Sequence, residues 1–389
     1  MNPGSPLEGH TIVLAVTGSI AAVETIRLAH ALRRRGVTVA GVMSPAATGI
    51  IHPDALTYAT GNETVTRISG KVEHVDYCGE GGTADLLLVA PCTANTLCKI
   101  SAGIDDTPVT TFATTAIGRG MPVVIAPAMH QSMYRHPAVL DALEKLRSWG
   151  IVVISPRMEE GRAKIASIEE IVLRCERELL GKPLAGKKVL ITSGACQEPV
   201  DDVRVLTTRS SGKMGRALAL QAWRLGAEVT VVHRDLFPCV ENVGCSSAVE
   251  MREAINSLCE SRDFHYYISA AAVSDFAPAR VHGKIPSGTP VSIALDPLPK
   301  ILDEVIARYG IPSIGFKLGW DEEERAREMV EQGTLLVAVN SPEALGSENS
   351  SIILFSREDR EFLCGTKEEV AAGIWDAVIR LRERGDRHS

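Results

Sequence analysis

The stretch VRVLTTRSSGKMGRALALQAWRLG, from Val203 to Gly226, decides the fold of the second half of the chain. It follows an apolar run that ends in a Thr-Ser-Gly turn (VLITSG), and it enters a helix whose first turn carries Lys213. A strand, a small-residue loop and a helix start favour an anion site, because unpaired N–H groups and the positive dipole end face the ligand. The spacing is not that of a Walker loop, since Ser-Ser-Gly-Lys is followed by Met-Gly. We therefore expect a phosphate site of another design, with an ordinary loop entering an amphipathic helix as the alternative.

Composition indicates a two-domain α/β enzyme. The 389 residues include 4% aromatic residues and 33 scattered glycines, and the net charge is −7. This charge gives no basic field for nucleic acid or acidic membranes, so neither is an expected partner. The N-terminus lacks a basic region followed by an apolar stretch, and no run is long enough for a membrane span, which predicts a cytoplasmic protein.

The nine cysteines contain no C-x-x-C pair. Cys92 and Cys98, like Cys239 and Cys245, enclose five residues, a spacing that fits no common zinc site. We predict reduced thiols that are mostly buried.

The first half alternates apolar runs with helical patterns. Thr11 to Thr17 (TIVLAVT) predicts a strand covered on both faces, and apolar residues recur at three and four positions from Ile20 to Arg35, as in a helix. Further strands are expected at Val37 to Met43, Ala84 to Ala90, Pro122 to Ala126 and Ile151 to Ser155, and helices at Asn95 to Ala102 and Pro137 to Trp149. This alternation indicates a doubly wound, Rossmann-like or flavodoxin-like domain with a mainly parallel sheet.

Ligands bind such sheets beyond the carboxyl ends of the strands. The residues expected there are small, hydroxyl-bearing or amide-bearing: Gly18-Ser19-Ile20, Ser44-Pro45-Ala46, Pro91 to Thr96, and Pro127-Ala128-Met129-His130. No G-x-G-x-x-G fingerprint is present, which argues against a standard NAD site and favours a mononucleotide.

Several motifs together resemble a known family. TGSIAA, the histidine in KVEHVDY, APCTANTLCKISAGIDDTPVTT and PAMHQSMY resemble the flavin-dependent cysteine decarboxylases, and SSGKMG resembles the ligase fused to them. End to end, the chain is similar to the bifunctional phosphopantothenoylcysteine decarboxylase / phosphopantothenate-cysteine ligase family of coenzyme A synthesis, in its archaeal form.

The resemblance implies that the first half binds FMN and that His74 is catalytic. In the family, FMN oxidises the thiol side of the substrate, which makes an electron sink for loss of CO2. Without the family, His74 reads as a surface or satisfied histidine, while its ordinary pKa suits a base. The implied FMN contacts are Gly18, Ser19, Ile20, Ser44, Thr93, Asn95 and Thr96.

Two departures from the family pattern affect the substrate site. The family's PAMN reads PAMH here, so His130, a catalytic and substrate-binding candidate, replaces an amide and holds a carboxylate only by donating N–H or as a cation. The clamp that usually carries a proton-donating cysteine reads MEEGRAK, Met158 to Lys164, so the proton donor is unassigned. The other implied substrate contacts are Met133, Arg162 and Lys164. Lys164 or Arg162 is expected to clamp the substrate's phosphate, although solvation of a charged loop also explains these two side chains.

A turn-rich connector, GKPLAG, places the domain boundary near residue 185, giving a decarboxylase domain at 1–185 and a ligase domain at 186–389. The second domain is expected to be another doubly wound sheet, with an antiparallel edge hairpin around Arg357 to Arg360 and a final helix from Thr366. Its strands are expected at Val189 to Ser193, Glu228 to His233, Tyr266 to Ala272, Ile314 to Leu318 and Leu335 to Val339.

The resemblance implies CTP and Mg2+ in the second domain, with Lys213 as a catalytic residue and Thr208 as a substrate contact. The segment Arg280 to Pro290 carries Lys284 and is interpreted as a mobile lid. For Lys284 or Asp275 considered alone, a solvated loop is the alternative interpretation. No metal ligand is assigned. The implied CTP contacts are Ser211, Gly212, Lys213, Ala271, Ala272, Asp275, Lys284, Pro299, Lys300, Ile301, Leu302 and Phe316.

Departures recur in this half. Thr208 replaces an asparagine, Gly319 replaces an acidic residue, and Glu331-Gln332 replaces paired lysines. They leave open whether CTP is preferred over ATP and whether both activities are retained.

The expected function is ligation of cysteine to 4'-phosphopantothenate through an acyl cytidylate, then FMN-dependent decarboxylation of the product to 4'-phosphopantetheine. The expected partners are these small molecules and other copies of the chain. A flavin-binding regulatory or partly inactive homologue that acts through assembly is one alternative. A generic NAD-dependent reductase is another, weakened by the missing fingerprint.

Overall fold

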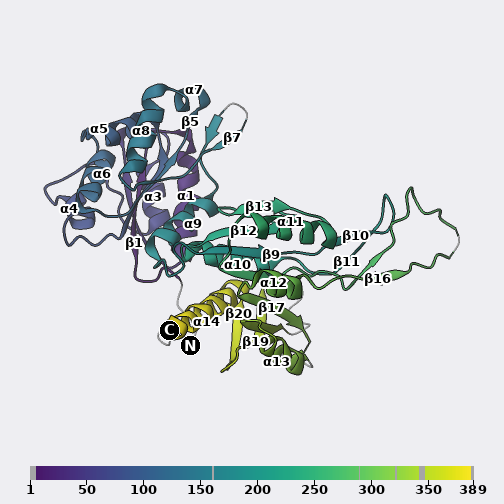
Figure 1. Ribbon diagram of the computed structural model, residues 1–389. Helices are drawn as coiled ribbons and strands as arrows, with labels where there is room; N and C mark the ends of the chain where they lie inside the picture. The colour runs from purple at the N-terminus through teal and green to yellow at the C-terminus, as the bar shows by residue number, and fades with distance from the viewer. Residues whose placement is uncertain (1–5, 160–161, 289, 320–321, 341–346, 387–389) are drawn as a thin grey trace. The chain divides into compact units, whose positions relative to one another are not determined.

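The computed structural model describes residues 6–159, 162–288, 290–319, 322–340 and 347–386. The chain divides into two compact units, Met1–Gly181 and Lys182–Ser389. Each unit is built around its own sheet, with helices on both faces (Figure 1). The predicted pair of doubly wound α/β folds is confirmed.

The first unit contains a five-stranded parallel sheet in the order β2-β1-β3-β4-β6. Side chains alternate across β1: Ile12 and Leu14 belong to one core cluster, and Val13 belongs to the other. This alternation explains the continuous apolar runs, because both faces of the sheet are covered. The strands are β1 (Thr11–Val16), β2 (Thr38–Met43), β3 (Leu86–Cys92), β4 (Val123–Pro127) and β6 (Val152–Val153).

Helices from different parts of the chain cover the two faces. One cluster includes buried residues of α1 (Thr25–Arg34), α3 (Pro53–Thr60) and α9 (Ile168–Leu179). The other includes buried residues of α4 (Glu73–Cys78), α5 (Ala94–Ala102), α6 (Pro108–Arg119) and α8 (Pro137–Ser148).

Two details of this unit differ from the sequence-based expectation. The helix expected from Ile20 begins as a 3-10 helix, η1 (Ile20–Glu24), and becomes α1 only at Thr25. The clamp is not a plain loop but part of a three-stranded antiparallel sheet in the order β5-β8-β7, formed by β5 (Met129–His130), β7 (Arg157–Glu159) and β8 (Arg162–Lys164).

The second unit is built on an eight-stranded sheet in the order β13-β12-β9-β14-β17-β18-β19-β20. Its last two strands form the predicted antiparallel edge hairpin, and the final helix α14 (Lys367–Asp386) follows directly. The strands are β9 (Lys188–Thr192), β12 (Glu228–His233), β13 (Glu241–Gly244), β14 (Tyr266–Ser269), β17 (Ser313–Leu318), β18 (Leu336–Asn340), β19 (Asn349–Phe355) and β20 (Arg360–Thr366). The other helices are α10 (Lys213–Arg224), α11 (Ala248–Ser261), α12 (Ile301–Tyr309) and α13 (Glu323–Glu331).

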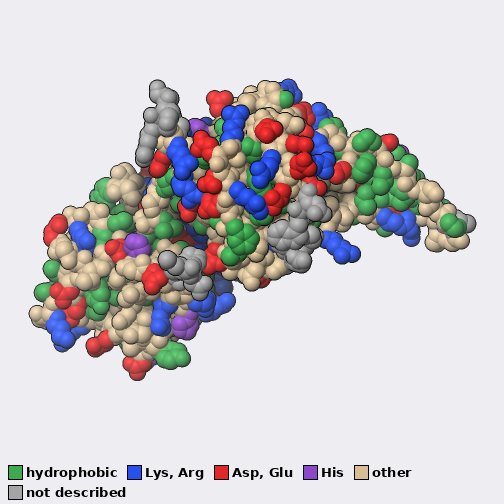
Figure 2. Space-filling view, turned by 90° about the horizontal axis from the view of Figure 1, so that it is seen from below, with side chains coloured by type: hydrophobic (Ala, Val, Ile, Leu, Met, Phe, Trp, Pro, Cys, Tyr) green, Lys and Arg blue, Asp and Glu red, His purple; other side chains and the backbone are tan. Residues whose placement is uncertain are grey.

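An arm that the sequence did not predict extends from this unit (Figure 1). It is formed by two antiparallel pairs, β10 (Gln197–Pro199) with β11 (Val205–Thr207), and β15 (Phe276–Pro278) with β16 (Leu295–Pro297). The expected lid segment lies between β15 and β16. Figure 2 shows hydrophobic side chains gathered along the arm, and acidic and basic side chains interspersed elsewhere on the face that it presents.

Five of the nine cysteines are buried, in keeping with the predicted burial of most thiols. Burial raises the pKa of the Cys78 and Cys196 thiols to about 12, so these two remain protonated and unreactive near neutral pH. Among the residues that the structure describes, no helix is both long enough and apolar enough to cross a bilayer.

Trp375 joins α14 to the rest of the second unit. Its side chain is fully buried, its Nε1 donates to the Leu218 carbonyl at 3.0 Å, and its ring meets Tyr266 edge-on at 6.0 Å. We expect Trp375→Ala to lower the free energy of unfolding of this unit by about 3–5 kcal/mol, because it leaves a cavity. Urea unfolding followed by circular dichroism measures this change, with Phe362→Ala, at a 61% exposed aromatic, as the matched control. Equal effects of the two substitutions would contradict the assigned packing.

Candidate functional sites

Three polar helix starts follow neighbouring strands of the first sheet. Ser19 follows β1 and caps η1, Ser44 follows β2 and precedes α2 (Pro45–Thr48), and Thr93 follows β3 and caps α5. Because β1 lies between β2 and β3, these helix starts share the carboxyl edge of the sheet at its topological switch point.

Thr17 links the loops after β1 and β3. Its Oγ1 donates to the Pro91 carbonyl at 2.7 Å and accepts from the Thr93 N–H at 3.0 Å. The Thr93 Oγ1 in turn accepts from the Thr96 N–H at 3.3 Å, which fixes the first turn of α5. The loops are therefore held in place by the protein's own hydrogen bonds.

The carboxyl edge has features that fit a flavin mononucleotide. The Ser44 Oγ is buried and has no hydrogen-bond partner among the described residues, so it is available to a bound group. A Cβ on Gly18 would lie 2.5 Å from the Ala46 Cβ, so the loops after β1 and β2 touch where a side chain would separate them. A glycine loop lets a ligand approach the backbone closely, and an unsatisfied hydroxyl can hydrogen-bond to it. Both features fit a bound phosphate or the polar edge of a ring.

His74 lies in the first turn of α4 and packs against α6. Its ring centroid is 6.4 Å from that of Phe112, and its Nδ1 is buried without a partner among the described residues. An unsatisfied ring nitrogen favours a ligand contact over a satisfied core histidine. The contact recorded for the ring is with Phe112, and none joins it to Ser44 or Thr93.

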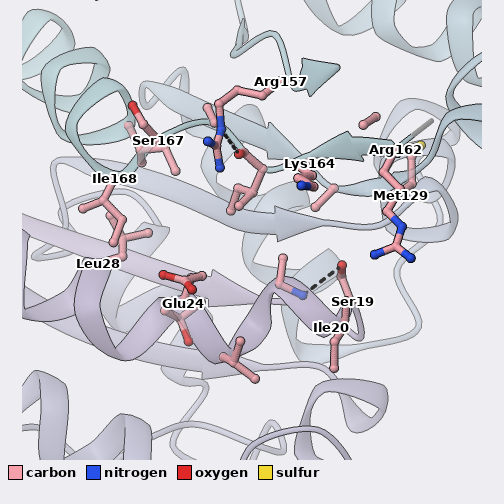
Figure 3. A pocket seen from close by; sticks show the side chains of 18 of the residues that line it. Ser19, Ile20, Glu24, Leu28, Met129, Arg157, Arg162, Lys164, Ser167 and Ile168 are labelled. Atoms are coloured by element: carbon pink, nitrogen blue, oxygen red, sulfur yellow. Dashed lines mark hydrogen bonds between the residues drawn. The ribbon is translucent and has the colours of Figure 1, made fainter. Parts of the chain in front are cut away.

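A pocket of about 940 Å³ lies between η1 and α1 on one side and the clamp sheet on the other (Figure 3). It brings together candidate residues from distant parts of the sequence: Ser19, Ile20, His130, Arg162 and Lys164. Met133 does not line it; this side chain lies on the short helix α7 (Gln131–Tyr134) and is 48% exposed. The His130 Nδ1 is 3.0 Å from the Ser132 Oγ, at the start of the same helix.

Glu159 pairs with two cations of the clamp sheet. Its carboxylate lies 3.3 Å from the Arg157 Nη1 and 3.1 Å from the Lys164 Nζ. The hydrogen bond from Lys164, aided by the charge of Arg157, lowers the pKa of the Glu159 carboxyl. The Arg157 Nε also donates to the Ile165 carbonyl at 3.1 Å. The roles of Arg157 and Glu159 were not predicted from the sequence, although the alternating charges around them are visible in it.

In the second unit, the Ser193-Gly194 turn packs directly against the start of α10. A Cβ on Gly215 would lie 2.3 Å from the Ser193 Oγ and 3.2 Å from the Ser193 Cα, and the Ser193 Oγ donates to the Gly212 carbonyl at 3.2 Å. Gly212 itself has a φ of 69°, a conformation that favours glycine. The helix start predicted at Lys213 is confirmed.

Candidate residues from the next loop meet this turn. The Ala272 N–H donates to the Gly194 carbonyl at 2.8 Å, and the Thr208 Oγ1 donates to the Ala272 carbonyl at 3.4 Å. The segments around Gly194, Thr208 and Ala272 therefore form one cluster at the carboxyl edge of β9 and β14. Phe316 lies farther along the sheet on β17, and Ile301 and Leu302 open α12.

The charged candidates of this unit pair with other side chains. Lys213 forms an ion pair with Glu348, which lowers the pKa of that carboxyl, and Asp275 forms one with Lys300. Burial, followed by the charge of Lys213, lowers the pKa of Lys367, so Lys367 lies near this pair. Glu348 and Lys367 were not predicted from the sequence, because they are distant from Lys213 along the chain and belong to no motif.

Lys284 is exposed in the arm. Within the described part of the chain, no group of three or more His, Cys, Asp or Glu side chains is placed to hold a metal ion.

Comparison with known proteins identifies both units. The model of the Flavoprotein family matches residues 2–179, and that of the DNA/pantothenate metabolism flavoprotein C-terminal domain matches residues 184–381. The Coenzyme A biosynthesis bifunctional protein CoaBC of Thermococcus kodakarensis is 47% identical over 388 residues, which cover 96% of each chain. The chain belongs to the bifunctional coenzyme A biosynthesis protein family.

Other members of the bifunctional coenzyme A biosynthesis protein family are also similar to this chain. The CoaBC protein of Methanocaldococcus jannaschii is 35% identical and matches 96% of this chain and 94% of its own. A crystal structure of the C-terminal domain of a CoaBC protein covers 52% of this chain and 100% of its own, with 28% identity and a TM-score of 0.45.

The close approach of Gly18 to Ala46 gives a test of whether flavin binds at this edge of the sheet. We expect Gly18→Ala to lower the flavin content of the purified protein at least about tenfold, because the added methyl group separates the loops after β1 and β2. Flavin absorbance per chain measures it. Gly118→Ala is the control, because a Cβ at Gly118 meets nothing within 4 Å. Full flavin content in the Gly18 variant would place the flavin elsewhere.

Proposed function

We propose that this chain makes 4'-phosphopantetheine in two steps. The second unit ligates cysteine to 4'-phosphopantothenate with CTP, and the first unit decarboxylates the product with FMN. The observation that carries the proposal is the pocket that joins Ser19 and Ile20 of the flavin edge to His130, Arg162 and Lys164. Family membership over nearly the whole chain supports both steps.

In the decarboxylase, FMN is held by the three helix starts of the first sheet. When bound, the flavin accepts the electrons of thiol oxidation and returns them after CO2 has left. The contacts on this chain are Gly18, Ser19, Ile20, Ser44, Thr93, Asn95 and Thr96.

Two histidines act on the substrate. In this proposal, the unsatisfied Nδ1 of His74, which does not line the pocket, accepts the proton that leaves the substrate, and His130, which lines it, donates N–H to the substrate carboxylate. Arg162 and Lys164 balance the negative charge of the bound substrate, with Met133 as a flanking contact. Holding the carboxylate near the flavin edge orients the bond that breaks.

In the ligase, the start of α10 holds the nucleotide phosphates. The N–H groups of its first turn, with Ser211, Gly212 and Lys213, neutralise charge on the transferring phosphate, and Mg2+ travels with CTP. Transfer of the cytidylyl group to the carboxylate releases pyrophosphate, and the amine of cysteine then displaces CMP. Thr208 contacts the substrate beside Ala271 and Ala272, and the remaining nucleotide contacts are Asp275, Lys284, Pro299, Lys300, Ile301, Leu302 and Phe316.

Assembly of several copies is part of the proposal. Ile20, beside the flavin edge, is 78% exposed, and Tyr58 on α3 is 80% exposed. Exposed apolar and aromatic side chains of this size are common in subunit contacts. Mass photometry of the purified chain tests this part separately.

The function is tested by incubating the full chain with 4'-phosphopantothenate, cysteine, CTP and Mg2+. Mass spectrometry should detect phosphopantothenoylcysteine and then 4'-phosphopantetheine. Replacing CTP with ATP decides the nucleotide preference. A flavin-containing protein that forms neither product would support the regulatory alternative instead.

We expect His74→Gln to lower kcat for CO2 release from phosphopantothenoylcysteine by about 10²- to 10⁴-fold, the usual contribution of a general base. Ligation should be unchanged, because His74 lies in the other unit. His30→Gln, on α1, serves as the control. Normal CO2 release by the His74 variant would remove this residue from the reaction.

We expect Lys213→Met to lower the rate of pyrophosphate release by about 10²- to 10³-fold, as when one charge-stabilising donor is removed. Decarboxylation of added phosphopantothenoylcysteine should continue at its normal rate. The matched control is Lys187→Met, because Lys187 precedes β9 at the amino edge of the same sheet. Equal losses in both variants would argue against a phosphate site at α10.

A further inference from the structure

The pocket of the first unit has two chemically different ends. Ser19, Ile20, Met129 and Arg162 lie at one end, beside the proposed flavin edge (Figure 3). Leu28, Ser167 and Ile168 lie at the other, and the Arg157 side chain projects into the pocket on that side (Figure 3). A ligand that reacts at the flavin edge and fills the pocket must therefore extend to Arg157.

The far end combines an apolar wall with one guanidinium group. Leu28 and Ile171 are each 1% exposed, and Ile168 lies beside them at the start of α9. Arg157 is held in place by its Nε bond to the Ile165 carbonyl, while its Nη1 meets Glu159 at 3.3 Å. No bond is recorded for its Nη2 within the described residues, so the outer face of the fork has donors for a ligand.

The charges that line the pocket favour an anion. The basic lining residues are Arg27, Arg157, Arg162 and Lys164, and the acidic one is Glu24. Glu24 is paired with Arg27 at 3.4 Å, and Glu159 is paired with Arg157 and Lys164, so the lining carries more basic than acidic side chains. The side chains of Arg157 and Glu159 are 48% and 44% exposed. Replacing this ion pair with a contact between Arg157 and a phosphate therefore requires little free energy.

We propose that Arg157 binds the phosphate monoester of the substrate and that Ile168, backed by the buried Leu28 and Ile171, contacts its branched aliphatic body. This inference rests on the proposed decarboxylase function, and it assigns each end of the pocket to one end of the substrate. The cysteine end lies at Met129 and His130, and the phosphate end lies at Arg157. Arg157 is therefore a specificity-determining residue, which makes the enzyme prefer a phosphorylated substrate over an unphosphorylated or peptidyl cysteine. A guanidinium fork suits this role, because it matches phosphate geometry.

The test compares substrates with and without the phosphate. In the flavin-loaded full chain, Arg157→Met should raise KM for phosphopantothenoylcysteine by about 10- to 100-fold, the value of a lost hydrogen bond to a charged group. KM for pantothenoylcysteine and kcat for both substrates should change little. Calorimetric titration with 4'-phosphopantetheine and with pantetheine needs no turnover. It should show a similar loss of binding affinity for the phosphorylated compound and no loss for the unphosphorylated one.

Two further variants keep the result decisive. Arg157→Gln is also neutral, and its amide retains a donor for the Ile165 carbonyl, so it should give the same loss if the Met variant is unstable. Arg147→Met, on the exposed side of α8, should retain the wild-type preference.

Unchanged discrimination in the Arg157 variants, or equal losses for both substrates, would overturn the phosphate assignment. The failure of the proposed function is distinct, because it would appear as no CO2 release by the wild-type chain.

Discussion

In both units, the candidate ligand edge depends on backbone that approaches backbone without space for a side chain. A Cβ on Gly18 would lie 2.5 Å from the Ala46 Cβ, and one on Gly215 would lie 2.3 Å from the Ser193 Oγ. These contacts bring a helix start against the end of a neighbouring strand or the loop beyond it. These helix starts lie at the carboxyl edges of the sheets, where the N–H groups of a first helical turn favour a bound anion.

The sequence predicted those parts of the fold whose burial produces a clear pattern of apolar residues along the chain. β1 and β3 are buried on both faces and read as apolar runs, and α10 begins at Lys213 after a glycine that adopts a positive φ. The edge hairpin was also predicted, because a polar turn separates its two apolar runs. Local sequence was sufficient for these elements, because local preference and tertiary burial agree.

The clamp sheet and the arm were not predicted, because their stability comes from partners distant in sequence. β7 has three exposed residues, and β8 pairs with β5 across more than 30 residues of chain. Phe276, Val291 and Leu295 in the arm are exposed, so they show no buried face from which a strand could be recognised. The same limit applies to the sites. Ser19 and Thr93 were found from their helix-start motifs, whereas Glu348 acts through Lys213, which lies 135 residues away in the chain.

The ion pairs at the two sites suggest how polyanionic substrates enter at low energetic cost. Arg157 with Glu159, Lys213 with Glu348 and Lys300 with Asp275 are all partly exposed, and such pairs contribute about 0–1 kcal/mol each. The carboxylates hold the cations in position and limit their repulsion before a substrate arrives. A phosphate carries more charge than a carboxylate and offers more acceptor oxygens, so it displaces the acidic partner without leaving a buried charge unpaired. The acidic residues beside the basic candidates are therefore compatible with phosphate binding, and they explain why a chain with a net charge of −7 can present local sites for anions.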